Sequence, residues 1–215
     1  MDNHPIQQLE QKLEHELELL EAVVRHARLT WLLRHFPPRP VWAGFVCLNC
    51  FVAIALLSAV AMASRSPFVF PSLGPTAYLL FFTPRSHAAS PKHAICGHAI
   101  GLLFGLFALW ITGLGHVPPV TTEGVNPARV LAAAISLGGT GAAMVMLNVG
   151  HPPAGATTLI VSLGFITQPH HLLVIEVAVA VLVVYTVVVN RSAGIDYPIW
   201  SPRPHERSLP RPPAE

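Results

Sequence analysis

The stretch HPPAGATTLIVSLG, from His151 to Gly164, decides how this chain must fold. It places two prolines, two glycines and two threonines between long apolar segments, where a regular membrane span carries mainly leucine and valine. Proline lacks an amide donor and its ring clashes with the preceding turn, so a regular helix cannot run through this stretch. The backbone must therefore change course within an apolar part of the chain.

A second stretch, PSLGPTAYLLFF from Pro71 to Phe82, has the same pattern of P-x-x-G-x-T followed by an apolar run. The aligned positions are Pro71 with Pro152, Gly74 with Gly155, and Thr76 with Thr157. Chance recurrence is the alternative in a chain with 21 Pro and 15 Gly, but both copies occupy the same place between two long apolar segments. The pattern favours two related units, about 41–115 and about 127–190.

The composition is that of an integral membrane protein. Hydrophobic residues make up 52% of the 215 residues and charged residues only 11%, with a mean hydropathy of +0.53. Spanning a bilayer takes about 20 apolar residues. Four segments meet this requirement, and we expect them to be transmembrane helices: Val41 to Ala63, Ala94 to Leu114, Ala128 to Val149, and Leu172 to Val189.

The two motif segments are expected to be short half-helices, either crossing the membrane as broken helices or entering it and turning back. With residues 68–70 extended and Ser72 to Thr83 helical, the first segment covers roughly 28 Å, close to the ~30 Å hydrocarbon core. If both segments cross and both termini are cytoplasmic, Arg65 and Arg129 are the only arginines or lysines near the spans on the outer side of the membrane. If both segments are re-entrant, Arg65, Arg85 and Lys92 lie on the outer side instead. The fold class is therefore all-α, and the charges favour an inverted 3+3 repeat.

Segments flank the transmembrane domain (41–190) on both sides. In the N-terminal region, 1–40, apolar residues recur every three or four positions within 5–35, which predicts an amphipathic cytoplasmic helix. This helix suits either a partner helix, and hence a homo-oligomer, or the lipid surface. The region 191–215 is expected to be a cytoplasmic tail, disordered because of its many prolines from Tyr197 onward.

Small residues indicate where helices approach one another closely. Gly97, Gly101 and Gly105 are spaced by four and predict a packing face on one helix. The span 128–149 is rich in alanine and glycine, which predicts that it lies in the centre of the bundle.

The sequences NVGHPPAGATT and PSLGPTAYLLF, in a small protein with four long apolar segments, resemble the HPP family of integral membrane proteins, over about residues 36–195. The resemblance implies four transmembrane helices and a transport function, and a plant plastid member has been assigned nitrite transport. The four-helix description differs from the six crossings favoured by the charges. We expect a bacterial inner (plasma) membrane protein with both termini in the cytoplasm.

A helix that begins within the membrane leaves its first amides unpaired and its N-terminus partly positive, which attracts anions. Two such ends facing each other would form an anion site in which glycines admit the ion and hydroxyls donate to it. Because no lysine or arginine is expected within a full span, a small monovalent anion such as nitrite is favoured over phosphate. The predicted anion-binding residues are Ser72, Gly74, Thr76, His151, Pro153, Gly155, Thr157 and Thr158.

Three ionisable residues at membrane depth are candidates for proton coupling: His151, His98 and Glu176. Alternatively, His151 only donates to a freed carbonyl, and Glu176 is an interfacial carboxylate. Asn148 can both donate and accept hydrogen bonds, and it is expected to contact the anion-binding residues rather than the anion itself.

The leading function is a transporter or channel for a small inorganic anion. The alternatives are a non-transporting membrane scaffold and an intramembrane enzyme, which the absence of a nucleophile–base motif disfavours. No cofactor is expected, and no metal site, since Cys47-x-x-Cys50 has no second pair. Membrane lipid is an expected partner and nucleic acid is not.

Overall fold

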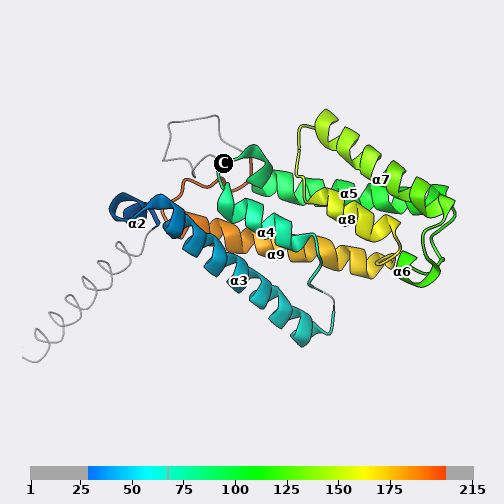
Figure 1. The fold of residues 1–215 in the computed structure, drawn as a ribbon, viewed down its shortest axis with the longest axis horizontal. Coiled ribbons are helices and arrows are strands. Elements are labelled where there is room, and N and C mark those ends of the chain that lie inside the picture. Colours follow the sequence, from blue (N-terminus) through cyan, green and yellow to red (C-terminus); the bar gives the residue numbers. More distant parts are fainter. Residues whose placement is uncertain (1–28, 67, 202–215) are drawn as a thin grey trace, which may run out of the picture.

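The computed structural model describes residues 29–66 and 68–201, and these form an all-helical protein without strands. Four of its helices are long and apolar enough to cross a membrane. They are α3 (Pro38–Ser64), α5 (Pro91–Ile111), α7 (Pro127–Met146) and α9 (Pro169–Ser192), shown in Figure 1. The four predicted spans are confirmed.

Each long helix begins with a proline, whose fixed φ and missing amide suit the first helical turn. Two of these starts are also capped by a side chain. The Ser90 side chain accepts from the His93 amide at the start of α5, and Asn126 does the same for Arg129 at the start of α7. The prolines therefore start spans as well as interrupting them.

The remaining helices are short. The two motif segments form α4 (Leu73–Phe82) and α8 (Ala154–Ser162), which confirms the expected half-helices. The other short elements are α2 (Leu29–His35), the 3₁₀ helix η1 (His87–Ala89) and α6 (Val120–Glu123).

Contacts between helix termini define two ends of the molecule. At the first end, Trp42 of α3 packs with Ile195 and Tyr197, which follow α9. The Asn190 side chain of α9 donates to the Leu80 carbonyl of α4 (3.1 Å), and the Tyr197 hydroxyl donates to the Ala89 carbonyl, just before α5.

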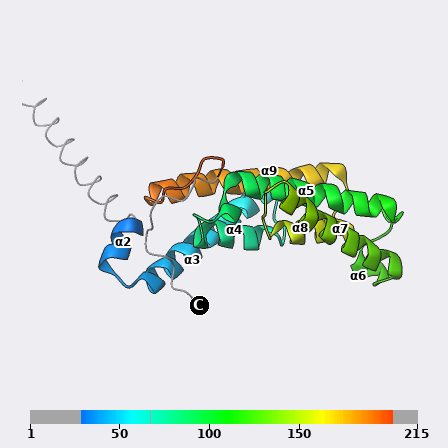
Figure 2. The ribbon, with the colours of Figure 1, turned by 90° about the horizontal axis from the view of Figure 1, so that it is seen from above.

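At the second end, Arg129 at the start of α7 donates to the Ser162 carbonyl at the end of α8 (3.1 Å). It also donates to the carbonyls of Val117 and Pro118, in the segment after α5. Helices α3 and α5 therefore run from the first end to the second, and α7 and α9 run back. The half-helices α4 and α8 run antiparallel to the long helices that precede and follow them in the chain (Figures 1 and 2).

Helix α5 forms the centre of the packing, and its glycines lie against α8. A Cβ atom at Gly97 would lie 2.6 Å from His151 Cβ, one at Gly101 2.8 Å from the Ala154 carbonyl oxygen, and one at Gly105 2.6 Å from Val161 Cβ. The predicted glycine packing face is thus confirmed.

The prediction that the alanine-rich span is central is wrong. Gly138 and Gly141 of α7 have nothing within 4 Å of an added Cβ, and α7 buries only a narrow face. Its buried face is formed by Arg129, Ala132, Ser136 and Thr140, and among its glycines only Gly139, against Phe104 of α5, makes a close approach.

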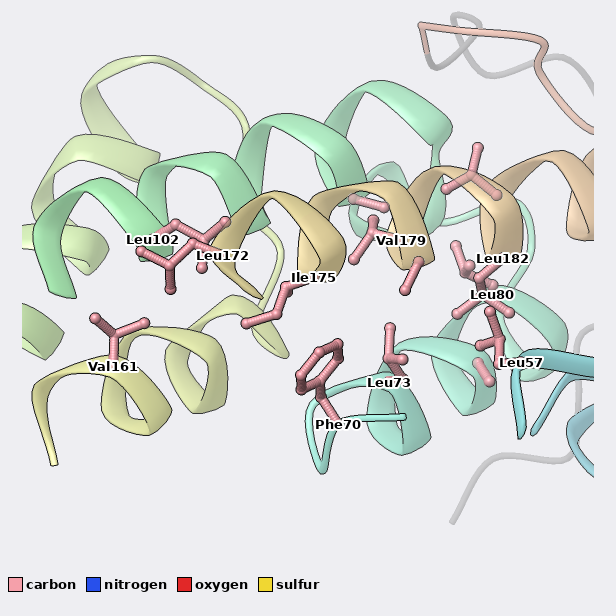
Figure 3. Close-up of a cluster of buried hydrophobic side chains, with 14 of the residues drawn as sticks. Leu57, Phe70, Leu73, Leu80, Leu102, Val161, Leu172, Ile175, Val179 and Leu182 are labelled. Atoms are coloured by element: carbon pink, nitrogen blue, oxygen red, sulfur yellow. The ribbon is translucent and has the colours of Figure 1, made fainter. Parts of the chain in front are cut away.

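The main hydrophobic core follows one face of α9. Ile175, Val179 and Leu182 of this helix are buried against α4, as Figure 3 shows around Leu73 and Leu80. The outer face of α3 instead exposes large apolar side chains such as Phe51 and Met62, as a lipid-facing helix does.

The C-terminal region differs from its prediction. Tyr197 is fully buried, its burial raises the pKa of its phenol, and the Trp200 carbonyl accepts from the Lys92 amide. The prediction of disorder is therefore wrong for residues 197–201, because the buried Tyr197 ring and the hydrogen bonds to Ala89 and Lys92 hold this segment on the first end. The prolines from 202 to 215 lie outside the described residues. The predicted amphipathic helix also lies outside them up to residue 28, so the homo-oligomer contact predicted through residues 5–35 stays a prediction.

Candidate functional site

The N-terminal halves of α4 and α8 meet at one histidine of α5. The Oγ1 atom of Thr76, on α4, lies 2.9 Å from His98 Nε2, and the Oγ1 atom of Thr157, on α8, lies 2.6 Å from His98 Nδ1. These two threonines occupy the same position in the two sequence motifs. The equivalent hydroxyls of both half-helices are therefore joined through a single imidazole.

His151 completes this cluster from the segment before α8. Its Nδ1 atom lies 2.8 Å from the Ala88 carbonyl oxygen of η1, and its Nε2 atom lies 3.4 Å from Thr76 Oγ1. The rings of His151 and His98 have centroids 5.0 Å apart. All four side chains of this histidine–threonine cluster (Thr76, His98, His151 and Thr157) are fully buried.

Two further hydroxyls, one from each half-helix, are buried without a hydrogen-bond partner. They belong to Ser72, which precedes α4, and to Thr158 of α8, and neither residue has exposed surface. Leaving a buried hydroxyl unpaired costs about 1–3 kcal/mol. These two donors, one at each half-helix, are therefore groups that a bound polar species would satisfy.

The backbone amides of α8 do not match the expected anion site. The amides of Ala154, Gly155 and Ala156 each donate to the carbonyl three residues earlier, over 3.0–3.1 Å. At α4, the Leu73 amide donates to the Phe70 carbonyl in the same way. The predicted row of unpaired amides is thus wrong for α8, because a tight turn before the helix satisfies them. Side-chain hydroxyls and imidazoles are the donors that remain, next to the positive ends of two helix dipoles.

Neither motif glycine faces the cluster. Gly74 is exposed with open space where a Cβ would lie, and a Cβ on Gly155 would meet Leu137 of α7 at 3.2 Å. The close approaches in this region are instead those of Gly97 to His151 and of Gly101 to the backbone of α8.

The other predicted residues are placed as follows. Pro153 is buried as the residue before α8. Asn148 is exposed, and only its backbone reaches the site region, through a hydrogen bond to His93. Glu176 has both carboxylate oxygens buried without a hydrogen-bond partner, so it makes no hydrogen bond to the histidine–threonine cluster.

Arg129 corrects the expectation that no full span contains arginine. It lies in the first turn of α7 and is buried, with only 1% of its surface exposed. Its guanidinium donates hydrogen bonds to three backbone carbonyls at the second end of the molecule, and these contacts hold the positive charge there.

The sequence alone did not identify the central residue. His98 was predicted only for proton coupling, whereas it joins the two half-helices. A signal was present, because His98 directly follows Gly97 in the glycine face that packs on α8. Among the described residues, no group of three or more His, Cys, Asp or Glu side chains is arranged to hold a metal ion.

A family model described as HPP, transmembrane region, matches residues 36–198. No curated protein and no solved structure matches the chain.

Proposed function

This chain belongs to the HPP transmembrane family, and from that premise we propose that it is a transporter or channel for a small monovalent inorganic anion such as nitrite. The anion binds where the N-terminal ends of α4 and α8 meet. The ligands are the hydroxyls of Ser72 and Thr158 and the histidine–threonine cluster. The protein resides in a bacterial inner membrane, with both termini in the cytoplasm.

In this proposal the chain crosses the membrane six times as an inverted 3+3 repeat. The support is the parallel direction of α3 and α5, which requires the segment containing α4 to return across the membrane. The same holds for α7 and α9 with α8 between them. The shared contact of Thr76 and Thr157 with His98 lies where the two repeats meet.

The observation that carries the proposal is the pair of unpaired, fully buried hydroxyls at Ser72 and Thr158. Hydroxyl donors, together with the positive ends of two helices, provide a site for negative charge. A small anion fits best, because direct hydrogen bonds of 2.6–2.9 Å already hold the side chains around His98 close together. A monovalent anion fits best, since the guanidinium of the buried Arg129 is engaged by carbonyls at the second end and does not balance further negative charge at the site.

The test is nitrite flux into liposomes that contain the purified full-length protein, with protein-free liposomes as the baseline. Thr76→Val and Thr157→Val remove the two hydroxyls at nearly constant volume. Each loses a hydrogen bond worth about 1 kcal/mol or more, so flux should fall by roughly fivefold to tenfold.

Thr186→Val is the matched control, because this buried threonine of α9 bonds only to the Leu182 carbonyl of its own helix. Its flux should equal that of the wild type. Absence of flux for nitrite, nitrate, formate, chloride and bicarbonate in the wild type would refute the proposal and favour a scaffold.

A further inference from the structure

The hydrogen-bond roles at His151 follow from its partners. The Ala88 carbonyl oxygen only accepts, so His151 Nδ1, 2.8 Å away, carries a hydrogen and donates it. A neutral His151 ring therefore has its lone pair on Nε2, which points towards Thr76. The main chain of η1 thus fixes the tautomer of His151.

Thr76 has one hydroxyl hydrogen and already has a short acceptor for it. Its Oγ1 donates to the Ser72 carbonyl oxygen at 2.8 Å, one turn earlier in the chain. It then offers only lone pairs to the two imidazoles. His98 Nε2 donates to one of them at 2.9 Å, while His98 Nδ1 accepts from Thr157 at 2.6 Å, so a neutral His98 is satisfied.

At the remaining contact, two acceptors face each other. His151 Nε2 and Thr76 Oγ1 lie 3.4 Å apart, the longest of the side-chain contacts in the cluster. A proton on Nε2 would turn this contact into a hydrogen bond and satisfy every polar atom of the cluster. The network is one proton short when both rings are neutral.

A proton at this position needs a negative partner. The titratable groups that face His151 are His98 and His93, both bases of α5. Helices α4 and α8 present threonine hydroxyls, η1 presents a carbonyl, and the Asn148 backbone after α7 bonds to His93. The Glu176 carboxylate of α9 makes no hydrogen bond to any of them. A buried charge without a partner is strongly unfavourable, so a bound anion and a bound proton stabilise each other.

We propose that His151 Nε2 takes up one proton with each anion, so that the protein carries out electroneutral cotransport of one proton and one monovalent anion. This inference rests on the proposed anion transport and adds its coupling ion. The proton binds to the Nε2 lone pair from the aqueous phase on the side of entry. It leaves from the same atom with the anion on the other side, and no other bond is made or broken.

The experiment measures nitrite uptake and proton uptake together in liposomes containing the full-length protein, with an entrapped pH-sensitive dye and protein-free liposomes as the baseline. One proton should enter with each nitrite ion. A pH gradient should drive accumulation of about tenfold per pH unit, and a potassium diffusion potential should not change it.

His151→Gln removes the titrating nitrogen and should reduce pH-driven uptake at least about tenfold, with no proton accompanying the residual flux. His87→Gln is the control, since this exposed histidine lies outside the cluster and should keep the wild-type proton-to-nitrite ratio. The wild-type ratio tests the proposal even if His151→Gln fails to fold.

Nitrite flux without proton uptake, or flux driven by membrane potential at constant pH, would overturn the coupling while leaving anion transport standing. A His151→Gln variant with wild-type proton coupling would also overturn it. Absence of any anion flux in the wild type would refute the proposed function and this inference with it.

Discussion

Gly101 lies where α5 packs closely against the backbone of α8, and Gly101→Ala tests this contact. The added Cβ would lie 2.8 Å from the Ala154 carbonyl oxygen, a backbone atom that moves only if α8 moves. Ordinary contact begins near 3.4 Å, so α8 must retreat by about 0.6 Å. Overpacking of this kind costs about 1–3 kcal/mol.

Gly141→Ala is the matched control, because it lies within α7 and has nothing within 4 Å of the added Cβ. Both substitutions gain the same helix propensity, about 0.5–1 kcal/mol, so the difference between them isolates the steric cost. Thermal unfolding of the purified proteins should place Gly101→Ala roughly 2–10 °C below Gly141→Ala.

The same displacement also affects the cluster. Thr157 moves with α8, so its 2.6 Å contact with His98 should lengthen towards about 3.2 Å. We expect nitrite flux in liposomes to fall roughly fivefold, as the loss of about 1 kcal/mol implies. If Gly101→Ala unfolds no earlier than Gly141→Ala and keeps full flux, the packing argument for α5 and α8 is refuted.

Three further predictions concern the two ends of the molecule. Arg129→Met should destabilise the protein by about 1–3 kcal/mol because three carbonyls lose their donor, and Arg129→Lys should lose less stability. Equal unfolding temperatures for the wild type and Arg129→Met would contradict this. Tyr197→Phe should cost about 1 kcal/mol, with exposed Tyr78→Phe as a neutral control. The pKa of Tyr197 is raised in the folded state, so the stability of the wild type should fall as the pH rises above about 10, the pKa in the unfolded chain. The stability of Tyr197→Phe should fall less steeply over the same pH range, and parallel pH profiles for the two proteins would contradict this. A cysteine at exposed Arg85 should react with an impermeant maleimide only from the cytoplasmic side, and labelling from outside would favour re-entrant segments.

The sequence was sufficient to predict the four long helices and the two half-helices α4 and α8. Long apolar runs gave the four spans, and the prolines at Pro71 and Pro152 gave the short helices, because both signals are local. The position of α7 was not predictable, since its alanines and glycines do not reveal whether another helix covers them. In the structure, Gly138 and Gly141 face open space.

The candidate site was predicted in part. The threonines of the two motifs were identified, but the role of His98 depends on which face of α5 meets α8, which is a tertiary property. The amides of α8 were expected to be free, yet the turn from His151 to Pro153 pairs them, a detail of backbone geometry that the motif does not specify.

The position of the anion tests the central claim most directly. Crystals of the full-length protein soaked in bromide would locate a monovalent anion by its anomalous scattering. The account predicts a peak between the N-terminal ends of α4 and α8, within hydrogen-bond distance of Ser72, Thr158 or His151. A peak elsewhere at membrane depth, with none at these ends, would contradict it.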